Sequence, residues 1–370
     1  MKIKNNKIIP YVDLSKQYKV EGKKLLSEIE KVLQSGQYIL SEKVLEFEQN
    51  VCKKLNVQYC ISVNSGTDAL ILSLLALNIG VGDEVITQSN SYIATAASIH
   101  AVGAKPVFAD VLDDQTIDPL SIKKLITSRT KAIMPVHLTG RICEMNEILD
   151  IAKKNNLKII EDSAQSFGSK YYNISSGSIG DCGAFSTHPL KNLNACGDGG
   201  FITTNNKKTS DFLKLKRNHG HIDRNTIKFW GTVSRLDSIQ ATILNFRLKN
   251  VDRLIAQRIK NADYYKKILN KEYVKFSPSR DYALDTYHLF VIQVKRRDKL
   301  KEFLKFNNIE TAIHYPIPIH KQKFLNHNNY RKLMNTEKQS KEILSLPINQ
   351  FMNEKKIKIV ASLINDFFEN

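Results

Sequence analysis

Short apolar runs alternate with helical patterns over the first two-thirds of this chain of 370 residues. The runs are bounded by Gly, Asp, Asn or Ser, as buried strands are, and they span residues 59–63, 84–87, 105–110, 132–137, 158–161, 183–186 and 200–203. Helical spacing lies between the early runs, over residues 68–77, 95–102, 118–126 and 145–155. This alternation predicts an α/β fold, in which a mainly parallel sheet is covered by helices on both faces.

Polar residues stand at the carboxyl ends of three expected strands. They are the segment Ser65-Gly66-Thr67, Asp162 and Ser186. Ligands of parallel sheets bind at the carboxyl ends of the strands. We therefore expect these residues to converge on one site.

The pattern changes after about residue 205. A long helical stretch covers residues 234–270, and strand-like segments follow at 274–278, 287–295 and 309–314. A chain of this length exceeds the size of one ordinary core. We predict a large domain over residues 1–249, N-terminal segment included, and a smaller C-terminal α+β domain over residues 250–370.

Composition and charge narrow the class of protein. With 42% hydrophobic and 25% charged residues, the chain has the composition of a soluble globular protein, and no apolar run reaches membrane-spanning length. Residues 1–7 are basic but lack the apolar stretch of a signal peptide, so a cytoplasmic location is expected. The net charge of +18 is scattered, which argues against a nucleic-acid partner and leaves attraction of a polyanionic small substrate open.

Spacing excludes several common kinds of site. The chain has neither a Gly-x-Gly-x-x-Gly opening a helix nor a Gly-x-x-x-x-Gly-Lys loop, which disfavours a nicotinamide dehydrogenase. Its histidines lack metal-ligand spacing, so no metal is expected. The five cysteines indicate reduced thiols, and we interpret Cys182 and Cys196 as buried small residues rather than reactive ones.

Lys191 is the most informative residue. It lies between Pro189 and a glycine-rich stretch at residues 197–200, and a strand upstream delivers Asp162. Pyridoxal phosphate (PLP) needs an amine for its aldehyde and a carboxylate for its ring nitrogen, and the protein supplies both. A surface lysine is the simpler alternative, but the flanking proline and glycines argue against a surface helix. We expect Lys191 to bind PLP and to act as general base for the proton shift.

Several of the other candidate residues have a simpler alternative. Free amides at a helix start, with the Thr67 hydroxyl, form a phosphate site or a plain helix cap. Asp162 either pairs with a pyridine nitrogen or caps the next turn. Gln165 could direct its amide to the phenolic oxygen of the ring, and Ser186 could donate to the phosphate. Tyr92 stacks on the ring or packs in a loop.

Together these segments resemble the DegT/DnrJ/EryC1/StrS sugar aminotransferases, PLP enzymes of the aspartate-aminotransferase fold, which is fold type I. The resemblance covers nearly the whole chain. It rests on residues 65–70 (Ser-Gly-Thr-Asp-Ala-Leu), 82–86 (Gly-Asp-Glu-Val-Ile), 135–138 (Pro-Val-His-Leu), 161–165 (Glu-Asp-Ser-Ala-Gln), 185–200 and 314–320 (His-Tyr-Pro-Ile-Pro-Ile-His).

By position, the resemblance implies a role for each candidate residue. Lys191 would be the catalytic lysine, and members with histidine there act as sugar dehydratases, so Lys191 argues against that branch. The remaining roles are Asp162 at the pyridine nitrogen, Gln165 near the phenolic oxygen, Gly66, Thr67 and Ser186 at the phosphate, Tyr92 over the ring, and His314, Tyr315 and His320 near the substrate. The segment of the last three is alternatively a rigid proline-rich loop.

One stretch departs from the family pattern. The family usually has Gly-x-Asn-x-Arg before its long helix, and the asparagine reaches the cofactor phosphate of the neighbouring subunit. Val233 stands at that position and cannot donate a side-chain hydrogen bond, so Ser234 or Arg235 would have to replace it. A homodimer with shared active sites is still what the resemblance implies.

The implied activity is transfer of an amino group, with glutamate as the expected donor, to a keto-sugar of deoxyamino sugar or polysaccharide biosynthesis. A nucleotide-linked 3-keto or 4-keto deoxyhexose is the expected acceptor, and the form of residues 191–200 favours carbon 3. Three alternatives remain open. They are a PLP-dependent sugar dehydratase, an aminotransferase of a keto-sugar acid without a nucleotide, and a protein of this fold that binds without turnover.

Overall fold

The computed structural model describes residues 8–328 and 330–369 and contains a central seven-stranded sheet. Its strand order is β1-β9-β8-β5-β4-β2-β3. The strands are β1 (Tyr59–Val63), β2 (Glu84–Gln88), β3 (Lys105–Ala109), β4 (Thr130–Met134), β5 (Lys158–Asp162), β8 (Cys182–Ser186) and β9 (Gly200–Thr204). β9 runs antiparallel to β1 and β8, while the other neighbouring pairs are parallel. The predicted α/β fold with a mainly parallel sheet is confirmed.

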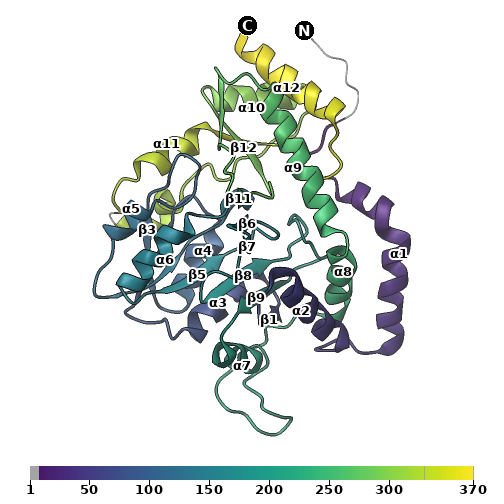
Figure 1. The fold of residues 1–370 in the computed structure, drawn as a ribbon, viewed down its shortest axis with the longest axis vertical. Coiled ribbons are helices and arrows are strands. Elements are labelled where there is room, and N and C mark those ends of the chain that lie inside the picture. Colours follow the sequence, from purple (N-terminus) through teal and green to yellow (C-terminus); the bar gives the residue numbers. More distant parts are fainter. Residues whose placement is uncertain (1–7, 329, 370) are drawn as a thin grey trace.

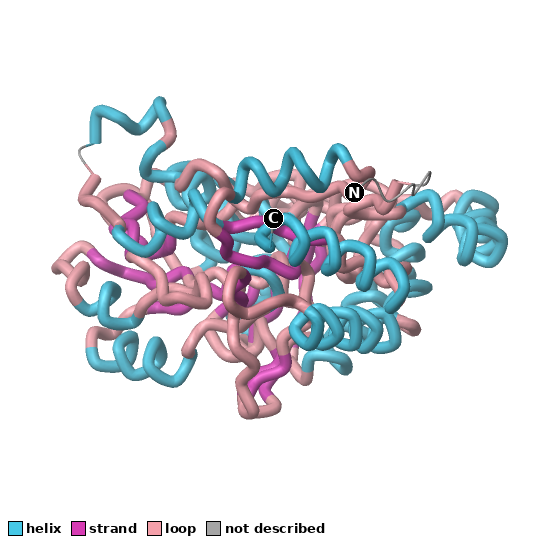
Figure 2. The backbone as a smooth tube through the Cα atoms, turned by 90° about the horizontal axis from the view of Figure 1, so that it is seen from above, coloured by secondary structure: helices cyan, strands magenta, loops and turns pink. Residues whose placement is uncertain are grey.

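Helices cover both faces of this sheet, and Figure 2 shows them outside the strands. They are α2 (Glu42–Leu55), α3 (Gly66–Ala76), α4 (Ile93–Ala101), α5 (Pro119–Lys123), α6 (Met145–Lys154), α7 (Lys207–Lys216) and α8 (Ser238–Leu248). Successive side chains of a strand point to opposite faces. Ile160 and Ile202 therefore pack against α3, α4 and α7, whereas Ile159 packs against α5 and α6, and Phe201 against α2 and α8.

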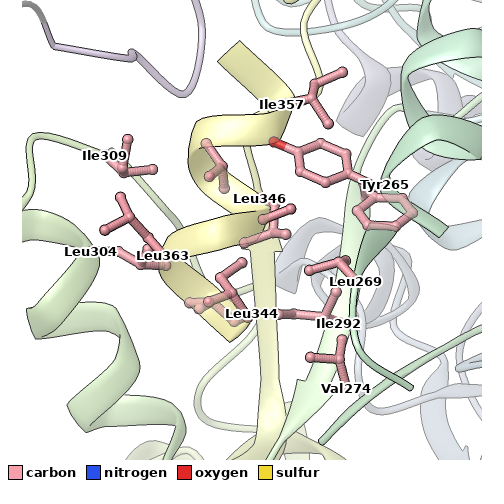
Figure 3. Packing of buried hydrophobic residues seen from close by; sticks show 14 of the residues in the cluster. Tyr265, Leu269, Val274, Ile292, Leu304, Ile309, Leu344, Leu346, Ile357 and Leu363 are labelled. Atoms are coloured by element: carbon pink, nitrogen blue, oxygen red, sulfur yellow. The ribbon is translucent and has the colours of Figure 1, made fainter. Parts of the chain in front are cut away.

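A second, antiparallel sheet lies in the C-terminal part of the chain (Figure 1). It contains β10 (Val274–Phe276), β12 (Phe290–Val294) and β13 (Ile343–Leu346), and α9 (Val251–Ile268), α10 (Arg297–Phe306) and α12 (Glu354–Glu369) pack against it. Figure 3 shows its buried cluster, in which Tyr265 lies among aliphatic side chains. The remaining elements are α11 (Met334–Glu342), a small sheet of β6 (Lys170–Tyr171), β7 (Ile174–Ser175) and β11 (Ala283–Leu284), and 3-10 turns at Leu138–Gly140, Ile319–Lys321 and Lys323–Asn328.

The N-terminal segment contacts both parts of the molecule. The Ile9 amide donates to the carbonyl of Asn308 at 2.9 Å, and Ile9 belongs to the C-terminal cluster. Helix α1 (Leu14–Ser35) then packs along α8. Its Gln17 exchanges side-chain hydrogen bonds with Asn194, in the loop that carries the predicted catalytic lysine. Segments at opposite ends of the chain are thereby brought together.

Two local predictions are wrong. Residues 309–314 do not form a strand, because Ile309 makes only an isolated bridge to Ile9, and Ala312 one to Ser345. The helix expected over residues 234–270 is two helices, and the chain turns between them, where the amide of Asn250 donates to the carbonyl of Arg247. Within residues 8–328 and 330–369, no helix combines the length and apolarity that crossing a membrane requires.

Candidate functional site

A pocket of about 450 Å³ contains nearly all of the predicted site residues. Those that line it are Gly66, Thr67, Tyr92, Asp162, Gln165, Ser186, Lys191, His314 and Tyr315. Ser91, Thr95, His188, Asp198 and His288 also line it and were not predicted. Strand ends of the central sheet and the segment before β13 thus meet at one cavity.

The start of α3 and the end of β8 approach closely at one end of the pocket. A Cβ atom on Gly66 would lie 2.6 Å from the Cβ of Ser186, so only glycine allows this approach. The Ser65 hydroxyl caps α3 by accepting from the amide of Asp68 at 3.1 Å. The first amides of a helix have no carbonyl partner within the helix. These amides and the Ser186 hydroxyl form a cradle for an anion, and the helix cap exists beside it.

Asp162 ends β5 and is 5% exposed. One carboxylate oxygen, Oδ2, accepts from the Thr95 hydroxyl at 2.7 Å, and the other, Oδ1, accepts from the amide of Ala164 at 3.2 Å. Burial raises the pKa of Asp162 above its ordinary value, while these two donors and the charge of Lys191 act against that rise. Asp162 therefore caps its turn and still presents a carboxylate to the pocket.

Gln165 is fixed in one orientation. Its Oε1 accepts from the amide of Thr139 at 2.8 Å, so its amide nitrogen is left to donate. That nitrogen donates to the hydroxyl of Tyr315. The side chain thus turns hydrogen-bond donors toward the pocket, as contact with a phenolate oxygen requires.

Lys191 extends from a turn that several other segments hold in place. Its amide donates to the carbonyl of His188 at 2.8 Å. The side chain of Asn194 donates to the carbonyl of Pro189 at 2.7 Å, and Arg247 of α8 donates to the carbonyl of Asn194 at 2.7 Å. Burial lowers the pKa of Lys191 to about 8, although Asp162 acts to raise it. A lysine that lines a cavity with this pKa does not fit the surface-lysine alternative.

One part of the pocket lining, which we call the aromatic wall, contains Tyr92, Tyr315, His314 and His288. Tyr92 is 58% exposed, and its ring centroid lies 5.9 Å from that of Tyr315. His314 shares a hydrogen bond of 2.9 Å with the Ser345 hydroxyl through Nδ1, and burial together with Lys191 lowers the pKa of His314 to about 4. Nδ1 of the buried His288 has no hydrogen-bond partner among the described residues. At neutral pH this wall offers neutral imidazoles to a ligand.

His320 lies outside the pocket lining. Its Nδ1 shares a hydrogen bond of 2.7 Å with the Ser89 hydroxyl, and its Nε2 contacts Glu337 at 3.2 Å. Both ring nitrogens are therefore engaged within the protein, and this residue supports the fold of the segment that follows Tyr315.

Val233 also lies outside the pocket lining. Val233 is 46% exposed and bridges to Asn218, at the base of a loop that extends beyond α7 in Figure 1. Ser234 is fully buried and accepts from the amide of Asn64 at 3.4 Å, so it cannot reach another subunit. Cys182 is buried as predicted, but Cys196 is exposed, because its loop passes over the end of α8.

The residues of the pocket fit pyridoxal phosphate. A half-buried amine, a buried carboxylate and an anion cradle line one cavity, and Gln165 turns a donor into it. Lys191 would bind the aldehyde, Asp162 the ring nitrogen, and the start of α3 with Ser186 the phosphate. All of these residues line the same pocket, and their roles stay predictions.

The sequence profile of one known family matches this chain. The DegT/DnrJ/EryC1/StrS aminotransferase family matches residues 19–365. A dTDP-3-amino-3,6-dideoxy-alpha-D-galactopyranose transaminase from Aneurinibacillus thermoaerophilus is 41% identical over 361 residues, which cover 97% of this chain and 99% of the relative.

Solved structures of similar proteins have the same fold. The crystal structure of S. venezuelae DesV in complex with a ketimine intermediate has a TM-score of 0.95 and 33% identity, and the match covers 98% of this chain and 99% of that one. NtdA from Bacillus subtilis with bound cofactor PMP has a TM-score of 0.91 and 30% identity, and the match covers 99% of this chain and 86% of that one.

Proposed function

The chain belongs to the DegT/DnrJ/EryC1/StrS aminotransferase family, and from this premise we propose that it uses pyridoxal phosphate to move an amino group from an amino acid to a nucleotide-linked keto-sugar. The observation that carries the proposal is the pairing of Lys191 and Asp162 in one pocket, which the start of α3 and Ser186 also line. A lysine amine of lowered pKa inside a pocket suits covalent capture of an aldehyde.

Each of three pocket residues has its own part in this proposal. When bound, pyridoxal phosphate would supply an aldehyde that takes up the amino group and a ring that delocalises negative charge at the substrate carbon. Asp162 would keep a proton on the ring nitrogen. Lys191 would hold the aldehyde and, as a free amine, would act as the base that moves the proton of the substrate carbon. Gln165 would orient the ring by donating to its oxygen.

The acceptor is proposed from chemistry and from the relatives together. The relative from Aneurinibacillus thermoaerophilus is named for a dTDP-linked 3-amino sugar, and this agrees with carbon 3 as the preferred position. A net charge of +18 favours a substrate that carries a diphosphate. We take glutamate as the donor and a nucleoside-diphosphate-linked 3-keto deoxyhexose as the acceptor.

A second copy of the chain would complete the site. The loop of residues 219–232 is anchored at its base and exposes Trp230 to 93% and Ile227 to 60%. Exposed apolar side chains gathered on one projecting loop are typical of a protein–protein contact. We propose a homodimer in which this loop contacts the partner subunit.

The test is a donor half-reaction followed by an acceptor screen. Protein loaded with PLP is mixed with glutamate, and we expect its visible absorbance to change as 2-oxoglutarate forms in equal amount. The aminated protein is then offered 3-keto and 4-keto sugars, with and without a nucleotide, and the product is identified by mass. A PLP-loaded protein that yields no keto acid from any amino acid would overturn the proposal, in favour of a dehydratase or of binding without turnover.

A further inference from the structure

Two hydroxyl groups connect the aromatic wall of the pocket to Asp162. The Ser91 hydroxyl lies 2.7 Å from the Thr95 hydroxyl, and the Thr95 hydroxyl lies 2.7 Å from Oδ2 of Asp162. Ser91 and Thr95 are 4% and 1% exposed, and both line the pocket. Ser91 precedes Tyr92, the N-cap of α4, and Thr95 lies in the first turn of that helix, so the chain entering α4 brings the two hydroxyls together.

The direction of these hydrogen bonds follows from the charge of Asp162. An ionised carboxylate only accepts, so Thr95 donates its single hydroxyl proton to Asp162. The oxygen of Thr95 is then left to accept the proton of Ser91. A protonated Asp162 would allow the reverse order. A hydroxyl that donates to Oδ2 favours the charged form of the carboxylate, and Thr95 accordingly acts to lower the pKa of Asp162 against the effect of burial.

Thr95 makes this bond in place of a local one. A threonine within a helix commonly donates to the carbonyl four residues earlier. Thr242 of α8 does so, with 2.9 Å to the carbonyl of Ser238. Thr95 instead directs its proton out of α4 to the end of β5. Its branched side chain has few rotamers, so the hydroxyl is fixed once the methyl group is packed.

We propose that Thr95, with Ser91 behind it, is a positioning residue that keeps the Asp162 carboxylate ionised and turned toward the ring nitrogen of the cofactor. The inference rests on the proposed function, because it assigns these hydroxyls a role only when PLP is the ligand. The titratable groups that act on Asp162 from neighbouring elements are Lys191 and His137, and Asp162 acts in turn on Tyr315. These three groups act on Asp162 through charge, whereas the donor to Oδ2 is the neutral hydroxyl of Thr95.

The experiment compares Thr95→Val, Thr95→Ser and Ser91→Ala with the unchanged protein. Valine keeps the shape and removes the hydroxyl, and serine restores it. We expect the dissociation constant of PLP to rise about tenfold or more in Thr95→Val, as for loss of a hydrogen bond to a charged group, and to rise only a few-fold in Ser91→Ala. Thr95→Ser should lie within about threefold of the unchanged protein. The pH at which the visible band of bound PLP disappears should shift in Thr95→Val and not in Thr95→Ser.

Thr242→Val is the matched control, because it removes an equally buried helical hydroxyl outside the pocket, and it should leave both readouts unchanged. If Thr95→Val does not fold, unchanged PLP affinity in Ser91→Ala contradicts the inference. A protein that binds PLP equally with and without the Thr95 hydroxyl overturns this inference alone. An unchanged protein that takes up no PLP overturns the proposed function, and this inference with it.

Discussion

The two sides of the pocket are built differently. Asp162 and Gln165 are committed to partners within the chain, Asp162 to Thr95 and Gln165 to Thr139. On the aromatic wall, Tyr92 is more than half exposed and Nδ1 of His288 has no partner among the described residues. The first two side chains are fixed before any ligand arrives, whereas the aromatic wall is left with unused contacts.

We infer from this difference that the fixed side chains hold the cofactor and that the aromatic wall binds the substrate. A group that holds a cofactor must keep one geometry for every turnover, which a saturated hydrogen-bond network provides. A wall that accepts a sugar gains from side chains that still have donors, acceptors and apolar surface to offer. Substitutions of the fixed side chains should therefore abolish chemistry, and substitutions on the aromatic wall should change the choice of substrate.

The largest expected effect is on Lys191. Replacement by alanine removes the amine that captures the aldehyde and moves the proton, and the rate of the glutamate half-reaction should fall on the order of 10³-fold or more. Borohydride reduction followed by mass spectrometry should attach PLP to the unchanged protein at Lys191 and not to the variant. Lys123→Ala removes an exposed lysine and should behave as the unchanged protein. Reduced PLP still attached in Lys191→Ala would refute the assignment.

A smaller effect should appear when the pH is varied. Only the neutral amine attacks an aldehyde, and burial lowers the pKa of Lys191 to about 8. The rate of PLP capture by cofactor-free protein should therefore rise about tenfold per pH unit below that value and level off above it. Stopped-flow absorbance measures this rate. A rate that still rises at the ordinary pKa of a free lysine would show that the amine is not perturbed.

The smallest effect is expected on the aromatic wall. Tyr315→Ala removes the ring near Tyr92, and the KM for the acceptor sugar should rise about three- to tenfold, the size of one lost aromatic contact. The half-reaction with glutamate should change less than twofold. Tyr315→Phe keeps the ring and serves as the control. If the half-reaction slows as much as the acceptor reaction, the separation of the two walls is wrong.

The sheet could be predicted because its strands are short, buried and apolar, and each ends within a few residues of its expected position. Helix α2 also has a readable pattern, since Val44, Phe47, Val51 and Leu55 are buried at helical spacing, but it was not predicted. Helix α1 is harder, because it buries Gln17 and Gly22 beside Leu25. The pairing of Ile309 with Ile9 joins segments that no local pattern connects.

The site, like the fold, contains residues that the sequence predicts and residues that it does not. Asp162 and Ser186 stand at strand ends, where the topology of a parallel sheet places ligands, and this made them predictable. Thr95 reaches Asp162 across two elements, and its spacing from Ser91 has meaning only once α4 is placed beside β5. His288 follows no motif and enters the pocket from the C-terminal part of the chain. Such residues reach the site only through tertiary packing, so the sequence alone does not predict them.

The N-terminal segment has a consequence for how the protein is made. Residues 9–17 are synthesised early, yet Ile9 bonds to Asn308, the carbonyl of Pro10 accepts from Asn349, and Gln17 bonds to Asn194. Contacts between such distant positions form late, because a long loop must close first. During synthesis, Ile9 and Pro10 cannot make these contacts until Asn308 and Asn349 have been added. We expect the lysine loop of the nascent chain to lack its full support until those residues are present.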